Sequence, residues 1–346
     1  MMKNVLVTGG SGYFGESLVR ILLDKKFNVS ILDINEPDKD ILENVKFFKC
    51  DIRSKDKVIE ICKNIDVILH NVAQVPLAKN NDLFHSVNYT GTENILEAAL
   101  INNCKHFVYT SSSAVFGVPL SNPVTNQSVP KPAETYGLAK YEGEKLALGY
   151  QDKGLNVTVI RPRTILGHGR LGIFQILFEW IHQGKNIPVF DGGDNLYQFI
   201  HADDLANAIV LATEKEIPGI FNIGTDRFMS MKETLNSLII HSKTKSKVKS
   251  LNSSFIIPFM KLFSYIGLSP LGAYHSLMYG KSMYFDLSKA KNELGWKPKY
   301  SNVEMFIESY EWYIKNKKNI LTNNNKSHHQ SAVKHGILSI FNKIFL

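Results

Sequence analysis

Three side chains that could move a proton lie in one short span of the sequence. Ser112 follows an apolar run (Phe107–Tyr109), and Tyr136 and Lys140 stand four residues apart among good helix formers. This spacing places two side chains on one face of a helix. Because an ammonium beside a phenol favours the phenolate, we expect the pKa of Tyr136 to fall below its usual value of about 10. Such a trio could take a proton from an alcohol while a hydride leaves the carbinol carbon.

This chemistry needs a hydride acceptor, and the first residues predict the site of one. A β-branched run from Asn4 to Val7 leads directly into T-G-G-S-G-Y-F-G and then into a helical pattern. Glycines between a strand and a helix let the backbone approach a pyrophosphate, and the helix N-terminus supplies N–H donors. The turn residues expected to contact a dinucleotide are Gly9, Gly12, Tyr13, Phe14 and Gly15.

The following strands end in residues that suit the rest of a dinucleotide. Val29–Leu32 leads to Asp33. The Asp33 carboxylate can accept both hydroxyls of the adenosine ribose and would repel a 2′-phosphate, so the sequence predicts NAD rather than NADP. Further cofactor contacts are expected where the pattern repeats, from Asp51, Ile52, Val72, Ala73 and Asn88.

The order of strands and helices predicts the fold class and its division. Strands that alternate with helices over roughly 20–30 residues predict an α/β fold with a Rossmann-type, doubly wound parallel sheet. We expect residues 1–166 to form the NAD-binding domain, with 198–212 returning to it. Residues 167–315 are expected to form mainly a smaller, mixed α/β substrate-binding lobe. Asp203 and Asp204 open a helical pattern, where carboxylates are favoured, and we interpret them as structural.

Taken together, these motifs resemble a known family. T-G-G-S-G-Y-F-G, the strand-end aspartates, H-N-V-A-Q, N-x-x-G-T, the serine cluster and Y-x-x-x-K are similar to the extended short-chain dehydrogenases, specifically the NAD-dependent epimerase/dehydratase family. The similarity covers residues 3 to about 315. It implies that Ser112 is the catalytic serine, that Tyr136 is the acid/base and that Lys140 binds the nicotinamide ribose. Arg161-Pro162 resembles the family's R-P, so Pro162 is expected beside the nicotinamide.

Departures from the family pattern bear on the substrate. Many nucleotide-sugar members have Asn at the place of Thr164 and Arg at the place of Tyr197, and a phenol cannot replace a guanidinium as a phosphate clamp. Dehydratases of the family carry Thr-Asp-Glu where this chain has Ser-Ser-Ala, so 4,6-dehydration is not expected. The candidate substrate contacts are Gln74, Ser113, Arg163, Arg170 and Tyr197. Either arginine could instead be a solvated surface charge.

Three functions fit these observations. The first is an NAD-dependent epimerase of a nucleotide-activated sugar, which works through hydride transfer and a keto intermediate. The second is an NAD-dependent dehydrogenase of a hydrophobic secondary alcohol, similar to the 3β-hydroxysteroid dehydrogenases, and the apolar stretch Phe255–Leu268 favours it. The third is a non-catalytic NAD-binding interaction protein, which the Tyr/Lys pair counts against.

Charge and composition limit the partners. The net charge is +8, but no Asp or Glu follows Glu311 whereas six Lys do, so the basic balance belongs mainly to the last segment. We therefore expect no nucleic-acid partner. The three cysteines lie far apart without metal or redox spacing, and no metal site is expected. Without a signal peptide or an apolar stretch of about 18 residues, a cytoplasmic location is expected. A homodimer is expected as well.

Residues 316–346 are expected to be separate from the rest of the chain. A polar linker, Asn316–Ser331, precedes apolar residues that recur at helical spacing with lysines on the other side. This pattern predicts a short basic amphipathic helix. Such a helix could dock on the body, pair with another subunit or make weak contact with an anionic membrane surface, and docking is the expectation.

Overall fold

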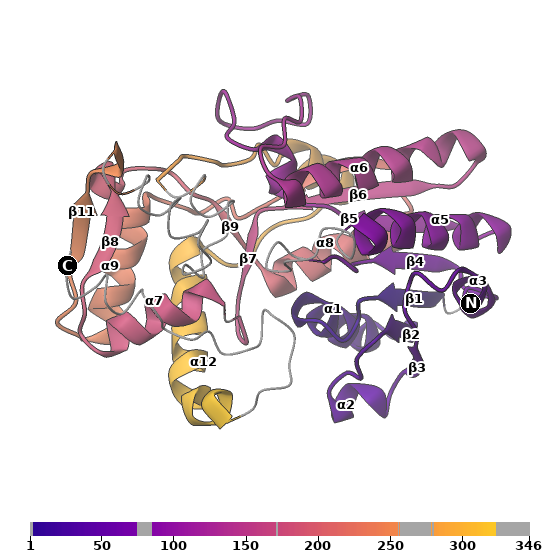
Figure 1. Cartoon of the computed structure of the whole chain (residues 1–346), viewed down its shortest axis with the longest axis horizontal. Coiled ribbons are helices and arrows are strands. Elements are labelled where there is room, and N and C mark those ends of the chain that lie inside the picture. Colours follow the sequence, from indigo (N-terminus) through magenta and orange to yellow (C-terminus); the bar gives the residue numbers. More distant parts are fainter. Residues whose placement is uncertain are drawn as a thin grey trace.

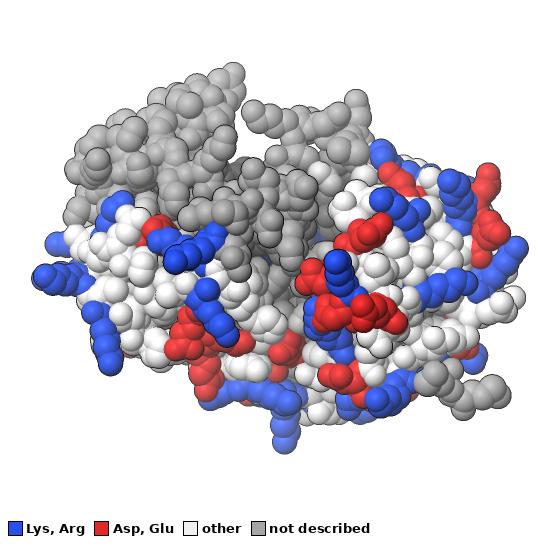
Figure 2. Space-filling model, turned by 90° about the horizontal axis from the view of Figure 1, so that it is seen from below, with Lys and Arg blue, Asp and Glu red and all other residues white. Residues whose placement is uncertain are grey.

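The computed structural model describes residues 3–74, 85–170, 172–254, 256, 278 and 280–322. Nearly all of the apolar stretch Phe255–Leu268 and the whole expected amphipathic helix near the end of the chain lie outside these ranges. None of the helices in these ranges combines the length and the apolarity needed to cross a membrane. On the face seen in Figure 2, acidic and basic side chains are interspersed over both halves of the molecule.

A parallel sheet forms the core of one half of the molecule (Figure 1), and its seven strands confirm the expected fold class. In spatial order the strands are β10 (Gly219–Ile223), β6 (Val157–Pro162), β5 (His106–Thr110), β4 (Val67–His70), β1 (Asn4–Thr8), β2 (Asn28–Asp33) and β3 (Lys46–Lys49). Strand β1 lies between β2 and β4, so the direction in which the chain adds strands reverses beside it. Ligands of doubly wound sheets bind at such a reversal, beyond the carboxyl ends of the strands.

Helices cover both faces of this sheet because its strands are apolar on both sides. Val5 and Val7 face one core and Leu6 faces the other, as alternation along a strand requires. Helices α1 and α8 lie on the first face, and α3, α5 and α6 lie on the second (Figure 1). The helices around the sheet are α1 (Tyr13–Asp24), α2 (Lys39–Leu42), α3 (Lys55–Ile61), α5 (Gly91–Ile101), α6 (Thr135–Gly149) and α8 (Ala202–Lys215). A π-helical turn, Ser86–Thr90, precedes α5.

A smaller group of elements lies beside the sheet and has its own aromatic core. It contains the pairs β7 (Thr164–Leu166) with β9 (Phe199–His201) and β8 (Ile187–Phe190) with β11 (Val248–Leu251), and the helices α7 (Ile173–His182), α9 (Met231–Ser242) and α12 (Asn302–Thr322). Phe174 and Phe199 pack edge-to-face against Phe306 of α12. Because α12 runs to Thr322, the expected start of a linker at residue 316 is wrong for residues 316–322. The proposed domain boundaries stay a prediction.

A buried carboxylate ties helix α8 to a late segment of the chain. Asp204, which is 1% exposed, accepts the backbone N–H groups of Lys299 (2.9 Å) and Tyr300 (3.1 Å). The indole N–H of Trp296 donates to the Asp204 carbonyl (2.9 Å). Its neighbour Asp203 is partly exposed and accepts one hydroxyl, from Ser17 of α1 (2.8 Å). Both carboxylates therefore have structural contacts.

These contacts predict unequal effects for two neighbouring substitutions. Asp204→Ala should lower the free energy of unfolding by about 2–4 kcal/mol, because it removes the buried carboxylate that accepts the backbone N–H groups of Lys299 and Tyr300. Asp203→Ala is the matched control, since it stands in the same first helical turn and should cost about 1 kcal/mol or less. Urea denaturation measures both values. Equal losses in the two variants would contradict this account.

Candidate active site

The turn between β1 and α1 and the first turn of α1 each have a position that accepts only glycine. Gly9 has a φ of +71°, and a Cβ there would lie 3.0 Å from the Val72 nitrogen. A Cβ on Gly15 would lie 2.1 Å from the Gly9 carbonyl oxygen. Side chains at these positions would force the turn apart, so the glycines keep the N-terminus of α1 close to the end of β1. That end of the helix presents N–H groups to the crevice where the strand order reverses.

Asp33 stands at the end of β2, beside this turn. Its carboxylate accepts the backbone N–H of Ser11 (3.1 Å) and that of Asn35 (3.0 Å). Burial raises the pKa of Asp33, and these hydrogen bonds oppose the shift. The Ser11 hydroxyl is buried and has no partner among the described residues. A narrow glycine cradle, a helix N-terminus, a strand-end carboxylate and an unpaired hydroxyl suit a dinucleotide.

Three of the other expected cofactor contacts, Asp51, Ile52 and Asn88, have partners within the protein. Arg53 binds the Asp51 carboxylate (2.6 Å) and lowers its pKa. Ile52 is buried in the core against α5. Asn88 accepts the backbone N–H of Gln74 (2.8 Å) and donates to the Gln74 carbonyl (3.2 Å), so it positions the segment after β4. Val72, Ala73 and the backbone of Gln74 form that segment.

Helix α6 and the serine turn meet without an intervening side chain. Ser112 caps the 3₁₀ turn Ser113–Phe116, and its hydroxyl accepts the N–H of Ala114 (3.1 Å). The Glu134 carboxylate caps α6 through the N–H groups of Tyr136 (2.8 Å) and Gly137 (2.6 Å). A Cβ on Gly137 would lie 2.4 Å from the Ala114 carbonyl oxygen. This close approach places the Tyr136 phenol beside the Ser112 hydroxyl.

The expected effect of Lys140 on the acidity of Tyr136 is wrong in this structure. Burial raises the pKa of Tyr136 to about 12. The hydrogen bond with Ser112 and the charge of Arg170 oppose that rise. The sequence reveals the four-residue spacing of the pair, but it does not reveal that desolvation of the phenol outweighs the nearby charges.

Lys140 belongs to the same face of α6 but turns toward the sheet. Its ammonium donates to the Thr110 carbonyl (2.7 Å) and lies 4.8 Å from the centre of the Tyr109 ring. The side chain is 3% exposed, and burial lowers the pKa of Lys140 to about 8. Glu144, one turn further along α6, opposes this shift. Lys140 is therefore held at the strand end rather than in solvent.

A buried ion pair that the sequence analysis missed supports this helix. Glu144 of α6 binds Arg161 of β6 through two hydrogen bonds, of 2.9 and 2.6 Å, and accepts the hydroxyl of Ser111. Both charged side chains are buried. Two bonds to one guanidinium fix the orientation of the helix as well as its position. The only local signal for Glu144 was its place four residues after Lys140, on the same face of the helix. Its partner Arg161 lies 17 residues further along the chain.

The candidate substrate residues lie on both sides of the serine turn. Arg163 is 1% exposed, so the alternative of a solvated surface charge is wrong for it. Its guanidinium donates to the Ser113 hydroxyl (2.8 Å) and stacks on the Tyr197 ring (4.4 Å). The Tyr197 hydroxyl bonds to that of Thr164 (3.0 Å). Arg170 lies 5.4 Å from the centre of the Tyr13 ring, on the side of the glycine turn.

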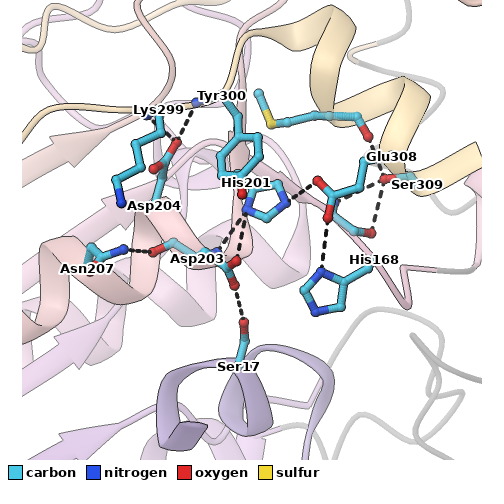
Figure 3. Close-up of polar contacts among 12 residues, drawn as sticks. Ser17, His168, His201, Asp203, Asp204, Asn207, Lys299, Tyr300, Glu308 and Ser309 are labelled. Carbon is cyan, nitrogen blue, oxygen red and sulfur yellow. Dashed lines mark hydrogen bonds and ion pairs between the residues drawn. The ribbon is translucent and has the colours of Figure 1, made fainter. Parts of the chain in front are cut away.

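The loop that carries Arg170 is anchored by two imidazoles and one carboxylate (Figure 3). Glu308 of α12 binds His168 (3.2 Å) and His201 (2.9 Å), and these bonds, opposed by burial, hold the pKa of Glu308 at about 2. Within the described ranges these three residues are grouped closely enough to hold a metal ion. However, His201 Nδ1 accepts the Asp203 N–H (3.1 Å), which places the ring proton on Nε2. A protonated nitrogen cannot bind a metal, so the geometry favours a hydrogen-bonded junction.

Comparison with known proteins gives an uncharacterised relative and relatives of two enzyme kinds, an epimerase and a dehydrogenase. An uncharacterised protein, y4nG, of Sinorhizobium fredii is 48% identical over 98% of this chain and 86% of its own length. A putative UDP-glucose 4-epimerase of Methanocaldococcus jannaschii is 28% identical over 90% of this chain and 99% of its own length. The human sterol-4-alpha-carboxylate 3-dehydrogenase, decarboxylating, is 30% identical over 62% of this chain and 58% of its own length.

Solved structures of low sequence identity share the fold. The Bordetella bronchiseptica enzyme WbmG, in complex with NAD, has a TM-score of 0.75 at 18% identity, over 91% of this chain and 95% of its own. A UDP-glucuronic acid 4-epimerase from Bacillus cereus, in complex with NAD, has a TM-score of 0.74 at 23% identity, over 90% and 99%. The NAD-dependent epimerase/dehydratase family matches residues 5–224. With the glycine cradle, the strand-end carboxylate and the Ser112–Tyr136 contact in place, this match shows that the chain belongs to the NAD-dependent epimerase/dehydratase family.

Proposed function

We propose that the protein is an NAD-dependent epimerase of a nucleotide-activated sugar. The contact between the Ser112 hydroxyl and the Tyr136 phenol carries this proposal, because it places a proton carrier at the carboxyl end of the sheet. The glycine cradle that suits NAD lies at the same end. The sugar-nucleotide substrate is supported by a relative, a putative UDP-glucose 4-epimerase, which this chain matches over nearly the whole length of that relative.

The side chains around the phenol can handle the substrate proton. The glycine turn and Asp33 would hold NAD, which would supply a hydride acceptor and donor for the carbinol carbon. Tyr136 in its ionised form takes the hydroxyl proton as the ketone forms and returns it as the ketone is reduced, while the Ser112 hydroxyl holds the same oxygen. Arg170 supplies positive potential that favours the ionised phenol. Epimerisation then requires the keto sugar to present its other face before reduction.

A second candidate is a dehydrogenase of a hydrophobic secondary alcohol. The hydrogen bond between Thr164 and Tyr197 (3.0 Å) favours it, because these positions carry Asn and Arg in many nucleotide-sugar members of the family. The sterol dehydrogenase relative supports the same class of substrate. Two incubations with NAD separate the candidates. With UDP-glucose, an epimerase forms UDP-galactose with no net NADH. With a hydrophobic secondary alcohol, a dehydrogenase accumulates NADH.

Removal of the phenol hydroxyl tests the proposed acid/base. Tyr136→Phe should lower kcat by about 10²–10⁴-fold, because the proton then has no carrier. NAD affinity, measured by calorimetry, should stay within about threefold of wild type because the ring is retained. A Tyr136→Phe protein with full turnover would eliminate Tyr136 from this role.

Two glycines of the same helix provide a second test. Gly137→Ala should lower kcat by at least about 10-fold, because the methyl group pushes α6 from the Ala114 carbonyl and separates the Tyr136 phenol from the Ser112 hydroxyl. Gly149→Ala is the matched control, since no heavy atom lies within 4 Å of its Cβ position. It should leave kcat unchanged. The proposal would be contradicted by equal turnover in the two variants.

The pKa of Lys140 predicts a pH effect on stability. Its folded-state pKa of about 8 lies below the usual lysine value of about 10.4. The unfolded chain therefore binds more protons between these values, and the contribution of Lys140 to stability rises with pH there. Between about pH 7.5 and about pH 9.5, wild type should gain about 2 kcal/mol relative to Lys140→Met in urea denaturation without cofactor. Parallel pH curves for the two proteins would show that the lysine titrates normally.

A further inference from the structure

Two arginines near the end of strand β6 are buried in different electrostatic settings. Arg161 binds the Glu144 carboxylate through two hydrogen bonds, which neutralises its charge. Arg163, two residues later, has only neutral partners within the described ranges. These are the Gln198 carbonyl (3.1 Å), the Ser113 hydroxyl (2.8 Å) and the Met283 sulfur (3.0 Å).

One nitrogen of Arg163 is left without any partner. Its Nη2 is fully buried and forms no hydrogen bond with the described residues. The side chain is 1% exposed, so bulk water does not replace the missing partner. A buried guanidinium that lacks a counter-charge and one of its hydrogen bonds is costly. Such a group in a native protein calls for an explanation, and an anionic ligand supplies both missing elements.

The position of Arg163 relative to the reacting groups indicates what kind of anion this is. Arg163 Nη1 binds the hydroxyl of Ser113, the residue after Ser112 in the chain. The Ser112 hydroxyl contacts the Tyr136 phenol. The guanidinium therefore binds the residue next to Ser112 in the serine turn, which places it close to the proposed acid/base pair.

Aromatic rings limit the size of the anion. The Tyr197 ring lies 4.4 Å from the guanidinium carbon, and the Phe285 ring lies 5.6 Å from it. One guanidinium edge between two rings suits a planar carboxylate, which accepts N–H groups in its own plane. A diphosphate needs more donors than this single free nitrogen offers.

From this placement we propose that Arg163 forms a carboxylate subsite and that the substrate is an alcohol with a carboxylate a few bonds from its reacting carbinol carbon. The inference rests on the proposed function for the location of the reacting carbon. Two sources share this chemistry: a nucleoside-diphosphate uronate and a carboxylated, lipid-like alcohol. Arg163 is then a residue that determines specificity, and it takes no part in the proton transfer.

Paired ligands test the subsite through a ratio of affinities. Calorimetry of the full chain with NAD compares UDP-glucuronate with UDP-glucose, and a 4-carboxysterol with the same sterol lacking the carboxylate. In wild type, the carboxylated member of one pair should bind about 10- to 100-fold more tightly than the neutral member. Arg163→Gln should bring this ratio close to one while the affinity for the neutral member changes by less than about threefold.

Two further variants separate recognition from a structural effect. Arg163→Lys keeps the charge and should retain part of the preference, which decides the matter even where Arg163→Gln is too unstable to measure. Arg227→Gln removes an exposed arginine that pairs with Glu304 (3.0 Å), and it should leave the ratio unchanged. A wild-type ratio near one in both pairs, or a ratio that survives Arg163→Gln, would overturn the subsite.

The outcomes also distinguish this inference from the proposed function. Turnover of UDP-glucose without any preference for the uronate would retain the epimerase and reject the subsite. An Arg163-dependent preference seen only with the sterol pair would retain the subsite and reject the sugar-nucleotide substrate.

Discussion

The site depends on one backbone contact, the approach of helix α6 to the carbonyl oxygen of Ala114. Only a residue without a side chain leaves room for it, because a Cβ on Gly137 would lie 2.4 Å from that oxygen. The contact fixes the distance between a helix and a turn that are separate in the sequence. The phenol and the hydroxyl that meet there are therefore positioned by main-chain packing rather than by their own flexible side chains.

Buried polar groups around this contact maintain its orientation. Glu144 joins α6 to Arg161 of β6, and Lys140 joins it to the Thr110 carbonyl of β5. Each buried charge reduces the tolerance for other arrangements, because a displaced helix would leave these groups without partners. Arg163 differs from them, since its partners within the described ranges are neutral. The contrast separates the charges that hold the fold from the charge that we propose binds a ligand.

Much of the fold and part of the candidate site could be predicted from local pattern. The glycine turn, Asp33 and the four-residue spacing of Tyr136 and Lys140 report short-range geometry, and the structure places them at the carboxyl ends of the strands. The pKa of Tyr136 could not be predicted in this way, because it depends on how much of the phenol the fold buries. The junction of Glu308 with two histidines joins residues far apart in the sequence, which no local pattern reveals.

The place of helix α12 has a consequence for biosynthesis. Strand β10, the last of the main sheet, ends at Ile223, yet Asp204 is satisfied by the backbone of Lys299 and Tyr300. The loop before Arg170 is likewise anchored by Glu308. A chain emerging from the ribosome can thus pair its strands long before these anchors leave the exit tunnel. The nascent protein therefore lacks both anchors until residues 299–308 have been synthesised.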